Sequence, residues 1–173
     1  MINLDPGEIF DSFYDKVYSF TLLRVGNIHD AEDIASDVFV KIVAKLGTYD
    51  PEKAALSTWI FTIALNEIRT YFRRRKVVIS IDDIHELIGQ FDPEQRLLHR
   101  EEYMKLYSAI RKLDDRQKNI VLLKYFGGVP NTQIAEMLGL SESNVGFILH
   151  RARKFLKNSL VSSDELEFAA HKR

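Results

Sequence analysis

The stretch from Val129 to Leu156 constrains the fold most, because its pattern fits two short helices joined by a tight turn. The first helix has one apolar face whose residues repeat at three and four positions: Ile134, Ala135 and Leu138. Asn131 is a candidate cap for its first turn. Gly139 can end it, because glycine adopts the left-handed conformation without steric cost. The pattern predicts a helical hairpin.

The second helix of this pair can be capped by Ser141, and it has two distinct faces. Its apolar face comprises Val145, Ile148, Leu149, Ala152 and Leu156. Its polar and basic face comprises Ser143, Phe147, His150, Arg151 and Lys154. Two helices, a turn containing glycine and a basic outer face are typical of a helix-turn-helix DNA-binding motif. A plain helical hairpin with a solvated basic face is the alternative.

The composition excludes several classes of protein. The chain has 173 residues, enough for one domain or two small ones, and 46% of them are hydrophobic. It contains no cysteine, which excludes disulfides, cysteine-ligated zinc and a thiol nucleophile, and its five histidines lack ligand spacing. We therefore expect a protein that binds no metal ion or cofactor, has no catalytic residue and is not an enzyme. Since no segment approaches the roughly 20 apolar residues of a membrane helix and no signal peptide is evident, we expect a cytoplasmic protein without membrane insertion.

The net charge of −1 conceals two segregated charged segments. Residues 69–76 are basic and contain Arg69, Arg73, Arg74, Arg75 and Lys76. Residues 30–37 are acidic and contain Asp30, Glu32, Asp33 and Asp37. Such a chain can contact phosphates with one surface and a basic protein with the other.

Two helices are predicted before the basic segment. The first starts at Asp5-Pro6 and carries an aromatic core stripe: Phe10, Phe13, Tyr14, Val17, Tyr18 and Thr21. The second spans Asp30–Leu46 after a break at Gly26-Asn27, and its apolar set is Ala31, Ile34, Ala35, Val38, Ile42 and Val43. Its acidic N-terminal end either complements the helix dipole or forms a docking surface for a basic partner.

A third helix is predicted to begin at Ser57. Its inner side comprises Phe61, Ala64, Leu65, Ile68 and Phe72. Its opposite side comprises Trp59, Thr62, Asn66, Arg69, Thr70 and Arg73. An exposed indole beside amides and arginines suits unpaired bases, because rings stack, amides bind base edges and cations bind the backbone. The alternative is that Trp59 packs on its neighbours and the arginines are solvated.

The remaining segments complete an all-α prediction. A helix should run from Asp92-Pro93 to about Lys112, and another from Asp114, capped with Gln117, to about Phe126. We therefore predict two small helical domains at residues 1–76 and 93–160, a linker at 77–92 and a tail at 161–173. The second domain contains the helix-turn-helix.

Three stretches resemble bacterial RNA polymerase sigma factors: D-A-E-D-I-A-S-D-V-F-V-K-I from Asp30, S-T-W-I-F-T-I-A-L-N-E-I-R from Ser57, and L-D-D-R-Q-K-N-I-V-L-L-K-Y-F-G-G from Leu113. The length and two-domain plan are similar to the extracytoplasmic-function (ECF) type, which keeps only regions 2 and 4. The resemblance covers roughly residues 8–76 and 94–157.

The resemblance implies binding to core RNA polymerase and promoter-specific initiation, including promoter opening. It assigns docking on the clamp helices of the largest subunit to Asp30, Glu32, Asp33, Asp37 and Phe39. It implies that the stretch containing Trp59, Thr62 and Asn66 binds the minus-ten element, and that the loop 47–56 captures a flipped base. The phosphates there would be held by Arg69, Arg73, Arg74, Arg75 and Lys76. An anti-sigma factor is a common partner in the family.

The resemblance also implies that the second domain reads the minus-thirty-five duplex and touches the flap of the second-largest subunit. The base-contacting residues would be Ser143, Asn144 and Phe147, and the phosphate-contacting ones Arg151, Arg153 and Lys154, with His150 on the same face. No residue is implied to be catalytic.

The sequence departs from the family pattern at two places. Thr70 stands where the family usually has Asp, and the run 146–148 reads Gly-Phe-Ile where the family has a basic, a small polar and a basic residue. Fewer cations should weaken phosphate binding. Two alternatives therefore stay open: a stand-alone helix-turn-helix regulator, and an interaction module that occupies a polymerase or an anti-sigma factor.

Overall fold

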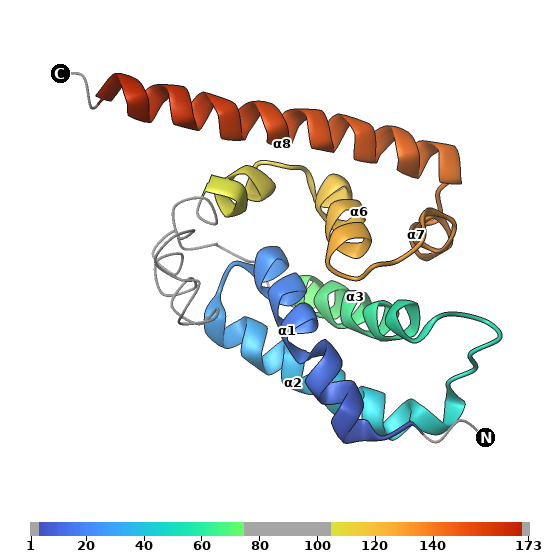
Figure 1. The fold of residues 1–173 in the computed structure, drawn as a ribbon. Helices are drawn as coiled ribbons and strands as arrows, with labels where there is room; N and C mark the ends of the chain where they lie inside the picture. Colours follow the sequence, from blue (N-terminus) through green and yellow to red (C-terminus); the bar gives the residue numbers. More distant parts are fainter. Residues whose placement is uncertain (1–3, 75–104, 171–173) are drawn as a thin grey trace.

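The computed structural model describes residues 4–74 and 105–170, with side chains up to residue 160. Within those ranges every regular element is a helix, which confirms the all-α prediction (Figure 1). Arg75, Lys76, the predicted linker at 77–92 and the predicted helix start at Asp92-Pro93 lie outside the described residues. No helix among the described residues is long and apolar enough to cross a membrane.

The first half is a bundle of three helices: α1 (Pro6–Val25), α2 (Ile28–Lys45) and α3 (Leu56–Arg74), with the short 3₁₀ helix η1 (Leu46–Thr48) after α2. As predicted, α1 is capped by Asp5, whose Oδ1 accepts a hydrogen bond of 3.1 Å from the Gly7 N–H. Gly26 ends α1 with φ 72°, a left-handed conformation that favours glycine. The side chain of Asn27 then caps α2, so two adjacent residues fix the turn between α1 and α2.

The second half contains a helical segment at residues 105–111, then α6 (Asp115–Tyr125), α7 (Asn131–Leu138) and α8 (Glu142–Ala170). Asp114 and Gln117 form the predicted capping box at the start of α6. Gly139 ends α7 with φ 65°, and the Ser141 Oγ accepts a 3.3 Å hydrogen bond from the Asn144 N–H in the first turn of α8. Local capping signals therefore located most of these helix ends correctly.

Some sequence predictions were wrong in detail. Asn131 is not the cap of α7 but its first residue, because Pro130 occupies the cap position, and its buried Oδ1 has no hydrogen-bond partner among the described residues. The predicted core residues Phe10 and Val43 are 44% and 55% exposed, because α1 and α2 bury narrower faces than their apolar stripes. The helix α8 runs on to Ala170, so the segment predicted as a tail at 161–173 begins as a continuation of this helix.

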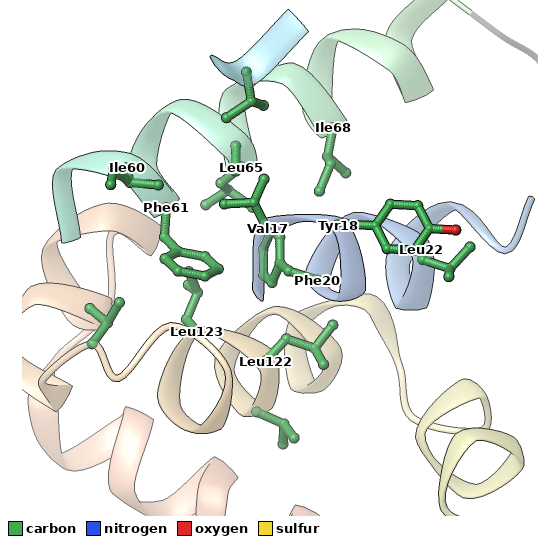
Figure 2. Close-up of a cluster of buried hydrophobic side chains, with 14 of the residues drawn as sticks. Val17, Tyr18, Phe20, Leu22, Ile60, Phe61, Leu65, Ile68, Leu122 and Leu123 are labelled. Atoms are coloured by element: carbon green, nitrogen blue, oxygen red, sulfur yellow. The ribbon is translucent and has the colours of Figure 1, made fainter. Parts of the chain in front are cut away.

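The buried apolar side chains form one continuous core that extends through both halves of the chain. Figure 2 shows its centre, where residues of α1, α3 and α6 meet: Val17, Phe20, Leu22, Ile60, Phe61, Leu65, Ile68, Leu122 and Leu123. The rings of Phe20 and Phe61 pack edge to face, with centroids 5.3 Å apart. The two halves, predicted as separate domains, therefore pack against each other.

Candidate nucleic-acid interface

One face of α3 carries the residues predicted to bind unpaired DNA. Asn66, Arg69, Arg73 and Arg74 are exposed on it. The Arg69 Nη1 donates a hydrogen bond of 3.3 Å to the Asn66 Oδ1. Thr62 is half-buried, and its hydroxyl donates to the Thr58 carbonyl at 2.8 Å, within the helix. The face therefore presents an amide held beside a guanidinium, followed by two further cations.

Trp59 is half-buried at the start of this face rather than fully exposed. Its ring lies 5.4 Å from that of Tyr49, tilted by 49°. The Tyr49 hydroxyl donates to the Ala54 carbonyl at 3.1 Å, so Trp59 rests on the loop between η1 and α3. The indole therefore packs on a neighbour and keeps part of its surface accessible.

The loop beside Trp59 is ordered by its own side chains. Asp50 accepts a 3.0 Å hydrogen bond from the Glu52 N–H and forms an ion pair of 3.2 Å with Lys53. The hydrogen bond from the Glu52 backbone, followed by the one from Lys53, lowers the pKa of the Asp50 carboxyl below its ordinary value. The loop predicted to capture a flipped base is therefore folded before any DNA arrives.

The acidic residues of α2 do not all have the same surroundings. Asp33 and Asp37 are exposed and lie on one face at a spacing of four residues. Asp30 instead accepts a 2.8 Å hydrogen bond from the Tyr71 hydroxyl of α3, and Glu32 is half-buried. Phe39 is only 7% exposed, so it supports the α2 surface from below rather than presenting its ring for docking.

Sequence reasoning missed the apolar part of this surface. Val40 is 67% exposed and Val43 is 55% exposed, and Val40 lies on the same side of α2 as Asp33 and Asp37. Phe10 of α1 is also partly exposed, with its ring 5.0 Å from that of the buried Phe39. The sequence did contain a signal for the exposure of Val40. This residue comes three positions after Asp37 and is not part of the apolar stripe predicted for this helix.

The basic face of α8 is exposed to solvent at every predicted position: Ser143, Asn144, Phe147, His150, Arg151, Arg153 and Lys154. The Phe147 ring is 60% exposed, and the Arg151 guanidinium carbon lies 5.6 Å from its centroid. This contact is a cation–π pair that orients both side chains on the surface. The apolar face of α8 packs on α6 and α7, with Val145 and Ala152 fully buried.

The structure also brings α3 and α7 together, which the sequence pattern did not predict. The Thr58 hydroxyl donates to the Gln133 Oε1 of α7, and the Arg69 Nη2 donates to the Met137 carbonyl at 3.3 Å.

The described part of the chain contains no group of three or more His, Asp or Glu side chains that could hold a metal ion.

Comparison with known proteins shows the family of this chain. The family models described as sigma-70 region 2 and sigma-70 region 4 match residues 9–77 and 103–156. RNA polymerase sigma factor YlaC of Bacillus subtilis (strain 168) is 30% identical over 165 residues, covering 92% of this chain and 94% of YlaC. The chain belongs to the sigma-70 family. It is an RNA polymerase sigma factor of the ECF type, with regions 2 and 4.

Further relatives agree with this assignment. ECF RNA polymerase sigma factor SigW of Bacillus subtilis (strain 168) is 27% identical over 166 residues, covering 88% of this chain and 87% of SigW. The sigma factor RpoE of Bartonella quintana, solved with the anti-sigma factor NepR, shares the fold with a TM-score of 0.69 and 20% identity, over 89% of this chain and 95% of RpoE. The present chain, as a sigma factor, therefore acts in promoter-specific initiation of transcription. The alternative function as a stand-alone helix-turn-helix regulator is not favoured.

Proposed function

We propose that α3 performs promoter opening at the minus-ten element. The observation that carries this assignment is the exposed Asn66 amide held beside the Arg69 guanidinium, with Trp59 at one end of the face and Arg73 and Arg74 at the other. Unstacking a base step costs a few kcal/mol, and binding the extruded base in a polar site offsets part of that cost. Arg69, Arg73 and Arg74 hold the phosphates, and the sequence adds Arg75 and Lys76 to this set.

We further propose that α2 docks on the clamp helices of the largest polymerase subunit. Asp33 and Asp37 supply the charge, because both are exposed on one face. Val40 and Val43 add apolar contact area beside them. Asp30 and Glu32 contribute from the edge of this surface, and Phe39 holds it in place from the core.

In the second half, α8 reads the minus-thirty-five duplex and region 4 touches the flap of the second-largest subunit. Ser143, Asn144 and Phe147 lie in the first turns, where a recognition helix meets base edges. The exposed Phe147 ring suits a thymine methyl group. The basic residues further along α8 contact the phosphates: His150, Arg151, Arg153 and Lys154.

An anti-sigma factor is the regulatory partner that we propose. Support comes from the shared fold with a sigma factor that was solved in complex with an anti-sigma factor. The protein works in the cytoplasm, because RNA polymerase and promoter DNA are found there.

The experiment on α3 compares polymerase binding with promoter opening in Asn66→Ala. A promoter is first obtained by run-off transcription of random fragments with core polymerase. Promoter opening is measured by the permanganate reactivity of unpaired thymines. It should decrease more than the affinity for core polymerase, because Asn66 contacts only DNA. Asn158→Ala, which removes an exposed amide from α8, is the matched control. Equal loss of both activities would refute the role given to Asn66.

The experiment on α2 reverses two charges, in Asp33→Lys with Asp37→Lys. The variant should bind core polymerase more weakly while its helical content is unchanged. Asp11→Lys with Asp15→Lys is the matched control, because those residues are exposed on α1 with the same spacing of four. An unchanged affinity would show that the acidic face of α2 is only solvated.

A further inference from the structure

The outer face of α8 exposes one large aromatic ring among polar and basic side chains. The Phe147 ring is 60% exposed, whereas Val145 and Leu149, two positions away on either side, are buried. The helix packs on α6 and α7 with its inner face, so Phe147 points away from both (Figure 1). Single exposed apolar side chains are common on protein surfaces, so the surroundings of this ring decide what it can do.

The guanidinium of Arg151 lies over the Phe147 ring. Its central carbon is 5.6 Å from the ring centroid, within the range of a cation–π contact. The two residues are four positions apart, and helical side chains tilt toward the N-terminus, so Arg151 leans onto the turn that carries Phe147. Among the described residues no carboxylate forms an ion pair with Arg151. Its N–H groups therefore remain available to a phosphate while its plane contacts the ring.

The position of the ring along α8 is that of a residue that contacts base edges. Phe147 lies in the second turn of the helix, which begins at Glu142. Ser143, one turn earlier on the same face, has its Oγ 3.1 Å from the Ser141 Oγ at the helix start. Recognition helices contact base edges with these N-terminal turns. In the major groove the apolar group that a ring can contact is the C5-methyl group of thymine.

We propose that Arg151 is a positioning residue for the reading of a thymine methyl group by Phe147. The guanidinium holds the ring on one side and a phosphate of the same site on the other. Because the ring is already oriented in the free protein, less side-chain freedom is lost when DNA binds. The feature that is read is the C5-methyl group, which uracil and cytosine lack. The inference rests on the proposed assignment of α8 to the minus-thirty-five duplex.

The test compares duplexes that differ by one methyl group. A labelled duplex carries the minus-thirty-five element of a promoter obtained by run-off transcription, and each thymine is replaced in turn by deoxyuridine. Fluorescence anisotropy gives the affinity of the full-length protein for each duplex. The natural protein should bind the thymine duplex roughly fourfold more tightly at one position, as expected for burial of one methyl group. Phe147→Ala should abolish this preference.

Arg151→Ala separates positioning from phosphate binding. It should bind both duplexes more weakly and also lose the preference for the methyl group, because the ring is no longer held. Arg151→Lys should keep part of the preference, since an ammonium group can also lie over a ring. Lys154→Ala is the matched control: it removes a cation from the same face, so it should bind more weakly with the methyl preference unchanged. Circular dichroism checks that all variants keep their helical content.

Two results would overturn the inference. One is the full methyl preference in Arg151→Ala, and the other is an equal loss of preference in Lys154→Ala. Failure of the α8 assignment itself has a different signature, because the natural protein would then bind the minus-thirty-five duplex no better than an unrelated duplex. A natural protein that selects the element but ignores every thymine methyl group would refute the reading by Phe147 and leave the assignment of α8 intact.

Discussion

Tyr18 shows how a single residue can couple two helices of the bundle. Its ring is buried in the core, stacked 6.2 Å from Tyr14 on the same helix. Burial disfavours the phenolate form and, with the nearby Glu32 carboxylate, raises the pKa of Tyr18 to about 12. The folded protein therefore keeps a proton that the unfolded chain loses at lower pH.

This pKa predicts how stability depends on alkaline pH. The contribution of Tyr18 is fully present below about pH 10, the ordinary tyrosine pKa, and is lost as pH rises toward about 12. Tyr18→Phe should therefore show a shallower fall in unfolding free energy over this window, measured by denaturant titration at each pH. Tyr125→Phe, at a position 56% exposed, is the control and should match the natural protein. Equal slopes for all three proteins would contradict the prediction.

Gly146 gives a second prediction for a single residue, because it lies inside α8 with no atom within 4 Å of an added Cβ. Gly146→Ala should stabilise the protein by about 0.5–1 kcal/mol, since alanine loses less conformational entropy in a helix. Gly139→Ala should instead destabilise it, because φ is +65° there. Thermal unfolding of both variants checks the pair, and destabilisation by Gly146→Ala would show that this glycine has a packing role.

At the scale of the element, α8 separates two tasks between its faces. Its inner face packs on α6 and α7 through Val145, Leu149 and Ala152. Its outer face is exposed and basic, so it can approach a duplex while region 4 stays packed on region 2. Its binding should be largely electrostatic, because the neutralisation of phosphates releases counterions.

The salt dependence of duplex binding tests this division. Arg151→Ala with Lys154→Ala should reduce the slope of log affinity against log salt by about 0.9 for each phosphate that the variant no longer neutralises. Lys45→Ala with Lys112→Ala removes the same charge from exposed positions elsewhere, and should leave the slope closer to that of the natural protein. Fluorescence anisotropy with labelled duplex over a salt series gives the values. The same slope change in both variants would mean that only net charge matters.

At the scale of the whole molecule, the continuous core makes the two halves one folding unit. Phe20 and Phe61 of the first half and Leu122 and Leu123 of the second are all fully buried at their junction. Burying one such side chain typically stabilises a protein by about 1.5–3 kcal/mol. Neither half therefore keeps its full stability when the other unfolds.

We expect one cooperative unfolding transition in denaturant. Trp59 is the single tryptophan and reports on the first half, whereas far-ultraviolet circular dichroism follows helices of both halves. The two curves should coincide. Phe61→Ala, a change that typically costs about 3–5 kcal/mol, should shift both curves together. Separate midpoints for the two signals would show that the halves unfold independently.

The sequence by itself determined the local features of this protein. The caps at Asp5, Asp114, Gly139 and Ser141 located most of the helix ends, and the helix-turn-helix followed from apolar spacing. These signals involve residues within a few positions of each other, so they act in any fold that contains the segment. The exposure of the basic face of α8 was predictable for the same reason.

The tertiary structure alone decided which surfaces are covered. The apolar pattern did not distinguish the buried Phe39 from the exposed Val43, because both lie on the same amphipathic helix. Which of the two side chains is buried depends on the helices that pack against α2. Nor did local pattern pair Arg24 with Asp115, which is 91 positions later. Burial depends on contacts between segments distant in sequence, whereas periodicity records only which faces are apolar. Packing of the halves was therefore decided by the folded chain.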